Sequence, residues 1–365
     1  MTARWLPAAL AAFFAFSAAP PVRAQAPAAG AQAPNTAVSG TITLVSYAGV
    51  FQDNYTETVI APFRRHFPNV QVNYFPGGTS AQMLGTVRGQ RNDPQTDVVI
   101  MDASISMLGN TEGLFERLTP AEVPSIEELS PEARAAGGEF GPAVTFDHLV
   151  VVYDTQRITP APTSLRFLWN PALRGQIGLS APPNIQGLAL TVMVAKMEGA
   201  DYRQTIDPAI ARLRELAPSV QTFDPNPEGY VLILNGVLSV ATGWNARAQL
   251  FNQQSQGRIG VLLPSEGSVF QINTINVVRG SRNRAAALAF ANYALGQEAQ
   301  KAFTERMFYA PTNARAQIAP EALARTAAAP ENRARMIPVD WAWMATVRDQ
   351  WNNRWRREIV TAAGR

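Results

Sequence analysis

The sequence predicts an α/β fold made of two doubly wound lobes that are joined by two crossover strands. Three observations lead to this prediction. Strand-loop-helix units follow one another after Gly40, and a second series of short strands and helices occurs after residue 175. Two extended runs, residues 143–153 and 268–278, exceed the usual strand length of about five or six residues. Alternating strands and helices are typical of sheets covered on both faces.

The first lobe begins with three strand-helix units. Residues 41–46 alternate polar and apolar side chains as a strand does, and residues 52–67 carry apolar side chains at helical spacing. Residues 70–75 repeat the strand pattern before a helix that begins near Ser80. Residues 97–101 form a nearly continuous apolar run, which is typical of a strand buried on both faces.

The second lobe follows the first long extended run. Its expected elements are short and apolar on at least one side: strands at residues 176–180, 220–222, 238–242 and 259–262, and helices at residues 187–199 and 208–216. After the second long run, two alanine-rich helices at residues 282–295 and 297–306 return to the first lobe. A last helix, residues 338–359, carries a stripe of tryptophans that we interpret as a packing face.

These elements predict how the chain is divided. The expected parts are a first lobe of residues 40–145 and 274–320, a second lobe of residues 146–273, and C-terminal helices in residues 321–365 that pack on the lobes.

The first residues have the pattern of an export signal. Arg4 precedes an apolar run of fifteen residues, and Val22-Arg23-Ala24 has the small-x-small pattern of a cleavage site. The run is shorter than the about 20 residues that cross a bilayer. We therefore expect residues 1–24 to be a cleaved signal peptide, residues 25–39 to be a flexible leader, and the mature protein to be soluble in the periplasm. The alternative is a buried N-terminal helix.

Composition excludes several classes of function. The chain has 365 residues, a formal net charge of +3 and no cysteine, so disulfides, thiolate metal sites and cysteine nucleophiles are excluded. Loss of Arg4 and Arg23 with the signal would leave a charge of +1, and the remaining arginines are scattered. Nucleic acids are therefore not expected as partners.

Catalytic motifs are scarce. The two histidines, His66 and His148, are interpreted as surface or hinge residues, and no nucleophile elbow, zinc-binding helix, phosphate loop or dinucleotide fingerprint occurs. The sequence thus favours a protein that is not an enzyme and needs no cofactor or metal. A secreted hydrolase or transferase with Asp102 or Glu266 as the base is the alternative.

Small and polar residues follow the predicted strands in both lobes. The clusters are Ser46-Tyr47, Gly78-Thr79-Ser80, Asp102-Ala103-Ser104, Asn184-Ile185-Gln186 and Gly243-Trp244-Asn245. Ligands of open α/β sheets bind beyond the carboxyl ends of strands, where helix N-termini offer free N–H groups. Ordinary helix capping explains any single position equally well. Together, the clusters predict a cleft for a small polar ligand.

Two later segments add a family resemblance. The segments Pro264-Ser-Glu-Gly-Ser-Val-Phe-Gln-Ile-Asn273 and Phe308-Tyr-Ala-Pro-Thr-Asn-Ala314, in this order behind an export signal, resemble elements of the periplasmic binding proteins of ABC importers. More specifically, they resemble the group that includes the spermidine/putrescine-binding proteins. The resemblance covers about residues 40–320 and implies a type II binding-protein fold, a monomer that closes over its ligand like a hinge and delivers it to a membrane permease.

The resemblance also implies ligand-binding positions: Ser46, Tyr47, Ser80, Ser104, Trp244, Gln271, Asn273 and Tyr309. Polyamine binders have an aspartate at the position of Asn273 and an aromatic residue at that of Gln271. A buried ammonium needs a carboxylate partner, so the two amides weaken the expectation of a polyamine. Asp102 and Glu266 remain candidate carboxylates.

We therefore predict a small polar or amine-bearing solute that is polyamine-like or zwitterionic. Iron(III)- or thiamine-type binding within the same fold is an alternative for the ligand. A chemoreceptor is an alternative to the permease as the partner.

Overall fold

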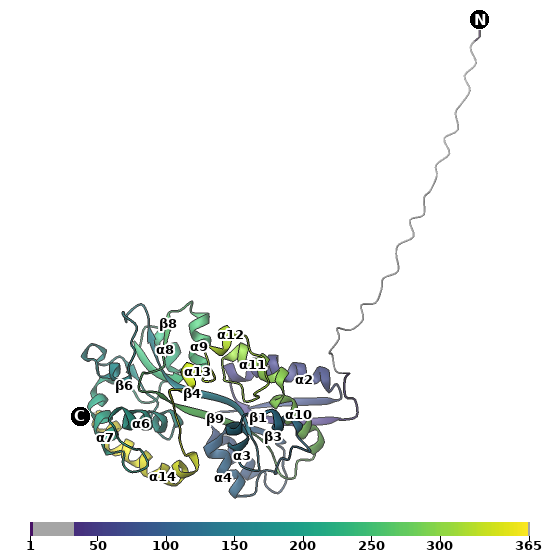
Figure 1. Ribbon diagram of the computed structural model, residues 1–365, viewed down its shortest axis with the longest axis horizontal. Coiled ribbons are helices and arrows are strands. Elements are labelled where there is room, and N and C mark those ends of the chain that lie inside the picture. Colours follow the sequence, from purple (N-terminus) through teal and green to yellow (C-terminus); the bar gives the residue numbers. More distant parts are fainter. Residues whose placement is uncertain (3–32, 364–365) are drawn as a thin grey trace. The chain divides into compact units, whose positions relative to one another are not determined.

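The computed structural model describes residues 1–2 and 33–363, and the fold lies within Pro34–Arg365 (Figure 1). The predicted signal peptide, apart from its first two residues, and most of the predicted leader lie outside the described residues. In the part of the chain that the structure describes, no helix has the length and apolar character needed to cross a membrane.

Ten strands pair within the described residues, in the order β2-β1-β3-β9-β4-β7-β5-β6, with β10 beside β9 and β8 beside β4. Their bounds are β1 Gly40–Tyr47, β2 Val70–Gly77, β3 Val98–Asp102, β4 Ala143–Asp154, β5 Ile177–Gly178, β6 Val220–Thr222, β7 Val240–Trp244, β8 Ile259–Leu262, β9 Ser268–Val277 and β10 Met336–Ile337. Strands β1, β2 and β3 are parallel, as are β5, β6 and β7.

Strands β4 and β9 connect the two groups of parallel strands. The first part of β4 pairs antiparallel with β9 as far as His148, and from Leu149 onward β4 pairs with β7 and then β8. Strand β9 continues beside β3 from Asn273. Both strands end within one residue of the predicted bounds, because β-branched and aromatic residues recur along them and favour strands.

Fifteen α-helices lie within the described residues. Their bounds are α1 Val50–Tyr55, α2 Ala61–His66, α3 Ser80–Gly89, α4 Ala103–Thr111, α5 Pro131–Ala135, α6 Ile185–Met197, α7 Asp207–Leu216, α8 Gly229–Leu234, α9 Asn245–Gln254, α10 Arg284–Leu295, α11 Gln297–Met307, α12 Pro320–Leu323, α13 Pro330–Arg333, α14 Trp341–Arg354 and α15 Thr361–Ala363. π-helical turns at Thr56–Ile60 and Trp355–Val360 continue α1 and α14.

In the first lobe, helices cover both faces of the sheet. Ile42 and Leu44 of β1 pack with Phe51 and the α10 and α11 side chains, whereas Val45 and Val99 face Met83 and its neighbours on α3 and α4. Figure 1 shows α3 and α4 below these strands and α2 and α11 above them. This alternation along one strand is what doubly wound packing requires.

The second lobe is covered in the same way. Val150 and Val152 of β4 pack with α8 and α9, and Leu149 and Val151 pack with α6, α7 and α14. The tryptophan stripe packs with Leu149 and Val151 on the α6 side. There the Trp355 indole Nε1 donates a 2.7 Å hydrogen bond to Thr191 Oγ1. The division of the chain at residues 145/146 and 273/274 stays a prediction.

Two sequence interpretations need correction. His148 is 1% exposed within β4, so it is not a surface residue, because helices cover both faces of this strand. The last helix begins at Trp341, not near residue 338, since the chain before it forms β10 beside β9 and Asp340 caps the helix.

Candidate functional site

The carboxyl ends of β1 and β3 meet the middle of β9. The strand register places Asp102 opposite Asn273, Asn273 opposite Thr145, and Asp147 opposite Gln271. Directly opposite residues on neighbouring strands project from the same face of a sheet. The register therefore gathers polar side chains from β3, β4 and β9.

Hydrogen bonds join these side chains to β1 and α3. The Tyr47 hydroxyl donates to Asn273 Oδ1 at 2.8 Å and lies 2.9 Å from Ser80 Oγ. Because the single Tyr47 proton goes to Asn273, Ser80 donates to Tyr47 and itself accepts from the Asp102 backbone N–H at 3.1 Å. Asn273 Oδ1 also accepts from Gln271 Nε2 at 3.3 Å. We call Tyr47, Ser80, Asp102, Gln271 and Asn273 the strand-end network.

Asp102 supplies the carboxylate of this network. It is 5% exposed and caps α4, because its Oδ1 accepts the Ser104 backbone N–H at 2.9 Å and the Ser104 hydroxyl at 2.6 Å. Burial raises the pKa of Asp102, and the Ser104 hydrogen bonds and the charge of Arg348 on α14 oppose that rise. A cation placed beside Asp102 would favour the ionised carboxylate.

A second group of charges lies at the start of α9. The Ala246 backbone N–H donates to Asp147 Oδ1 at 3.1 Å, so Asp147 accepts a hydrogen bond from the N-terminal turn of α9. Burial raises the pKa of Asp147 to about 8, against the hydrogen bonds that it accepts and the charge of Arg247. Arg247 forms an ion pair with Glu228 at the start of α8.

Tyrosines surround these groups. Tyr309 stacks on Phe303 with ring centroids 5.3 Å apart, and the Tyr230 hydroxyl donates to the Trp244 carbonyl at 3.0 Å. Gly243 permits the latter contact, because a Cβ there would lie 2.3 Å from the Tyr230 hydroxyl oxygen. Burial raises the pKa of Tyr309, and the nearby charge of Arg247 opposes the rise.

The structure brings six of the predicted ligand-binding residues together: Tyr47, Ser80, Asp102, Ser104, Gln271 and Asn273. Ser46 precedes Tyr47 and is fully buried, and its hydroxyl has no hydrogen-bond partner among the described residues. Trp244 is half-buried and immediately precedes α9.

Other predicted residues serve local structure. Thr79 caps α3 reciprocally with Gln82, next to the exposed Gly78, and Asn184 caps α6 through the Gln186 backbone N–H at 3.0 Å. The Gln186 side chain accepts from Thr242 at 3.3 Å, and Asn245 Nδ2 donates to the Arg325 carbonyl at 2.8 Å. Helix capping therefore accounts for Thr79 and Asn184.

Glu266 has a different set of partners. Its carboxylate accepts the Ser164 hydroxyl, the Leu165 backbone N–H at 3.0 Å and the Ser265 hydroxyl at 3.1 Å. These contacts hold the start of the 3₁₀ turn Leu165–Trp169. Within the described residues, none of them reaches the strand-end network.

The sequence interpretation missed Asp147 and Arg247. Asp147 is a charged residue inside a long apolar run, and Arg247 follows the cluster at residues 243–245. Asp147 carried a usable signal, because a charge inside a buried strand needs a partner.

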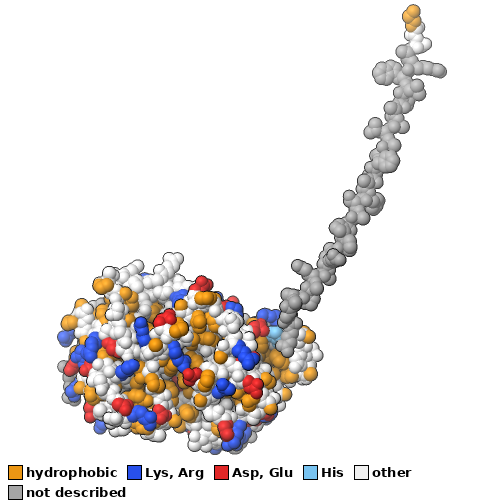
Figure 2. All heavy atoms as spheres, in the orientation of Figure 1, with side chains coloured by type: hydrophobic (Ala, Val, Ile, Leu, Met, Phe, Trp, Pro, Cys, Tyr) orange, Lys and Arg blue, Asp and Glu red, His pale blue; other side chains and the backbone are white. Residues whose placement is uncertain are grey.

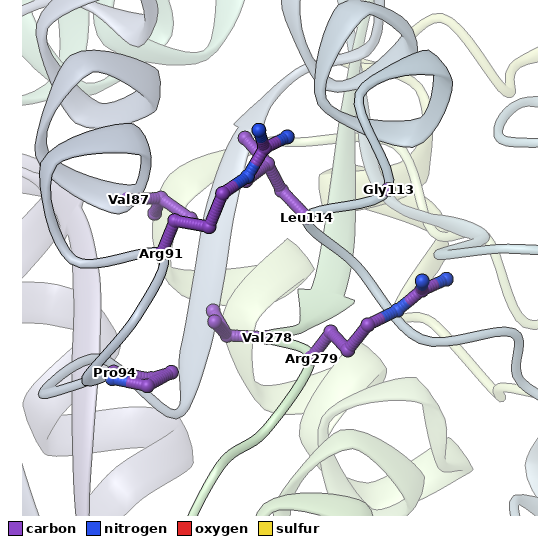
Figure 3. A pocket seen from close by; sticks show the side chains of 7 residues that line it. All are labelled: Val87, Arg91, Pro94, Gly113, Leu114, Val278 and Arg279. Carbon is purple, nitrogen blue, oxygen red and sulfur yellow. The ribbon is translucent and has the colours of Figure 1, made fainter.

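Two hollows lie away from the network. A small one of about 80 Å³ is lined by Val87, Arg91, Pro94, Gly113, Leu114, Val278 and Arg279, and Figure 3 shows that its two guanidinium groups do not converge. It adjoins the segment before β3, at the opposite end of that strand from Asp102. A larger one of about 470 Å³ lies between α4, residues 137–140 and α14.

The surface gives no sign of a nucleic-acid site on the face drawn in Figure 2, where Lys and Arg side chains intermingle with Asp and Glu. Among the residues with described positions, no group of three or more His, Asp or Glu could hold a metal ion.

Comparisons with known proteins identify the family. A model described as "Bacterial extracellular solute-binding protein" matches residues 58–334. A gamma-aminobutyric acid-binding protein of Pseudomonas aeruginosa is 26% identical over 291 residues, which are 76% of this chain and 78% of that protein. A spermidine/putrescine-binding periplasmic protein of Haemophilus influenzae is 22% identical over 219 residues, 57% of this chain and 59% of that protein.

A solved structure shows the same fold. An ABC transporter substrate-binding protein from Bradyrhizobium japonicum matches with a TM-score of 0.74 and 20% identity, over 87% of this chain and 99% of that one. This match confirms the predicted fold class, and the relatives confirm the predicted family resemblance. The chain belongs to the bacterial extracellular solute-binding proteins, which bind small ligands for ABC permeases and are not enzymes.

Proposed function

We propose that this protein is the periplasmic binding component of an ABC importer and that it captures a small amine-bearing organic solute at the strand-end network. The observation that carries the proposal is the buried Asp102 carboxylate beside the hydrogen-bonded side chains of Tyr47, Ser80 and Asn273. Residues 1–24 are the export signal in this proposal and are removed from the mature protein.

The ligand lies between the lobes and contacts strand ends from both. Tyr47, Ser80, Asp102 and Ser104 contribute from the first lobe, and Trp244 contributes from the second. Strands β4 and β9 act as the hinge, since they carry Thr145, Gln271 and Asn273 and continue into both lobes. Closure joins the two lobe surfaces that a permease recognises.

Asp102 makes an ammonium group the best-matched cation. A primary ammonium has three N–H donors, and an ionised carboxylate accepts hydrogen bonds on both oxygens. Both Ser104 hydrogen bonds fall on Oδ1, so Oδ2 is the oxygen that would accept the ligand N–H. Burial strengthens such a pair relative to one in water.

A single ammonium fits this site better than the two or more of a polyamine. Asn273 is 1% exposed, and its amide is used by Tyr47 and Thr145. A neutral amide cannot balance the charge of a second buried ammonium. The relative that binds gamma-aminobutyric acid, a compound with one amine, supports this reading.

Isothermal titration calorimetry on residues 25–365 tests the proposal, with 4-aminobutyrate, n-butylamine, 1,4-diaminobutane and spermidine as ligands. We expect at least one of these amines to bind with one-to-one stoichiometry and without chemical change. If none of them binds and none raises the melting temperature, the proposed amine site is wrong.

Tyr47→Phe is the matched test of where the ligand binds. The change removes the hydrogen bonds to Ser80 and Asn273, and we expect it to weaken binding about fivefold, the cost of about one hydrogen bond. Tyr55→Phe is the control, because the Tyr55 hydroxyl is buried without a hydrogen-bond partner among the described residues. Equal affinities of the two variants would place the ligand elsewhere.

A further inference from the structure

We propose that Arg247 binds a carboxylate group of the ligand, so that the substrate class is an amino acid whose ammonium and carboxylate groups are separated by a short chain. This inference rests on the proposed function, because it places the second end of a ligand whose ammonium group lies at Asp102.

The position of Arg247 follows from the hydrogen bonds around it. It lies in the first turn of α9, next to Ala246, whose backbone N–H is bound by Asp147. Asp147 lies opposite Gln271 on β9, and Gln271 donates to Asn273 of the strand-end network. The start of α9 is therefore held beside Asp147, the residue directly opposite Gln271 of the strand-end network.

The present partner of Arg247 can be replaced. Glu228 pairs with Arg247 near the surface, where the Glu228 side chain is 44% exposed and the Arg247 side chain is 21% exposed. Ion pairs that water reaches contribute at most about 1 kcal/mol. A ligand carboxylate that binds the guanidinium through two hydrogen bonds, away from water, is the stronger partner.

Asp147 does not form an ion pair with Arg247 as Glu228 does among the described residues. Its carboxylate already accepts the backbone N–H groups of His148 and Ala246 at 2.8 and 3.1 Å. Burial also raises its pKa to about 8 and so disfavours its charged form. The guanidinium keeps its positive charge for an anionic ligand group.

The charges of Asp102 and Arg247 both act on Tyr47, in opposite directions. Burial and the Asp102 charge raise the pKa of Tyr47, and the Arg247 charge lowers it. The ring is held in place by hydrogen bonds to Ser80 and Asn273, and its backbone carbonyl accepts the Tyr74 hydroxyl at 2.6 Å. A negative group at Asp102 and a positive group at the start of α9, both near this fixed ring, match a zwitterion.

The test compares two ligands that differ in one group. 4-Aminobutyrate and n-butylamine have the same primary ammonium on a four-carbon chain, and only the first has a carboxylate. Calorimetry measures both affinities for the wild-type chain, Arg247→Gln and Glu228→Gln, with Arg306→Gln as the control. Arg306 is an exposed arginine that pairs with Glu57.

We expect wild type to bind 4-aminobutyrate at least tenfold more tightly than n-butylamine. Arg247→Gln should weaken 4-aminobutyrate binding by about 10- to 100-fold, which is the range for a lost charge-assisted hydrogen bond. The same change should alter n-butylamine binding by less than twofold, because this ligand has no carboxylate. Glu228→Gln should strengthen 4-aminobutyrate binding, because the competing carboxylate is gone, and Arg306→Gln should change neither affinity.

Two results would overturn the inference while leaving the proposed function intact. In the first, wild type binds n-butylamine or 1,4-diaminobutane as tightly as 4-aminobutyrate. In the second, Arg247→Gln weakens both ligands equally or neither. If no amine binds to wild type, the proposed function itself fails and the inference fails with it.

Discussion

The two charged sides of the proposed site are held by different means. On the Asp102 side, Tyr47, Ser80 and Asn273 are joined by hydrogen bonds between buried or half-buried groups, so their geometry is set before a ligand arrives. On the Arg247 side, an ion pair with the more exposed Glu228 holds the guanidinium. The difference suggests that the first side fixes the orientation of the ligand and the second selects its chemistry.

The largest expected effect comes from removing the charge on the fixed side. Asp102→Asn keeps an oxygen for the Ser104 hydrogen bonds but removes the negative charge, so affinity for any amine ligand should fall about 100-fold. Calorimetry measures the loss, and Asp93→Asn, which breaks an exposed ion pair with Arg282, is the control. A change of less than threefold for Asp102→Asn would mean that the ammonium lies elsewhere.

Strand β4 connects the Asp102 side and the Arg247 side of the proposed site. The buried His148 on this strand makes the stability of the protein depend on pH. Burial lowers the pKa of His148 to about 3. The unfolded chain binds a proton at this residue below about pH 6.5 and the native chain does not, so stability is lost as the pH falls from 6.5 toward 3. The loss from this residue should be about 2 kcal/mol between pH 7 and pH 5.

Urea unfolding at both pH values measures this loss. His148→Gln cannot take up the proton, so its free energy of unfolding relative to that of wild type should rise by about 2 kcal/mol from pH 7 to pH 5. His66→Gln is the control at the other histidine, which lies near the surface in contact with Glu298. An unchanged pH dependence in His148→Gln would show that β4 opens to water more readily than its burial indicates.

A gain in affinity, smaller than the loss expected for Asp102→Asn, sharpens the role of the fixed side. Asn273→Asp adds a carboxylate that can accept from Tyr47, Gln271 and Thr145 alike. Affinity for 1,4-diaminobutane should rise about tenfold, since a second ammonium gains a partner. Gln271→Glu is a matched comparison two residues away. A gain only in Gln271→Glu would move the second amine position toward Asp147.

The sequence predicted the fold class and most strands because their patterns are local. Alternation in β1 and the unbroken apolar run of β3 can be recognised without knowing what packs on them. The start of α14 at Trp341 could not be predicted from the sequence. The strand before it, β10, is only two residues long and forms by pairing with β9.

The candidate site was predicted less completely. The pattern of polar residues after strands selected Tyr47, Ser80 and Asp102, which hydrogen bonds join, and also Thr79 and Asn184, which cap helices, because the same residue types serve both purposes. Arg247 was missed because its meaning depends on β4, which brings Asp147 to α9 from 99 residues away along the chain. Such a contact is set by tertiary structure and leaves no local pattern.

Helix α14 and the π-helical turn after it carry most of the tryptophans of the protein. Four of the seven tryptophans lie in residues 341–355, on a helix that packs in the second lobe and also contacts α4, the helix that Asp102 caps. Indole emission depends on the surroundings of the ring, so movement between α4 and α14 would change it. Intrinsic fluorescence could thus follow ligand capture in real time, with no dye attached.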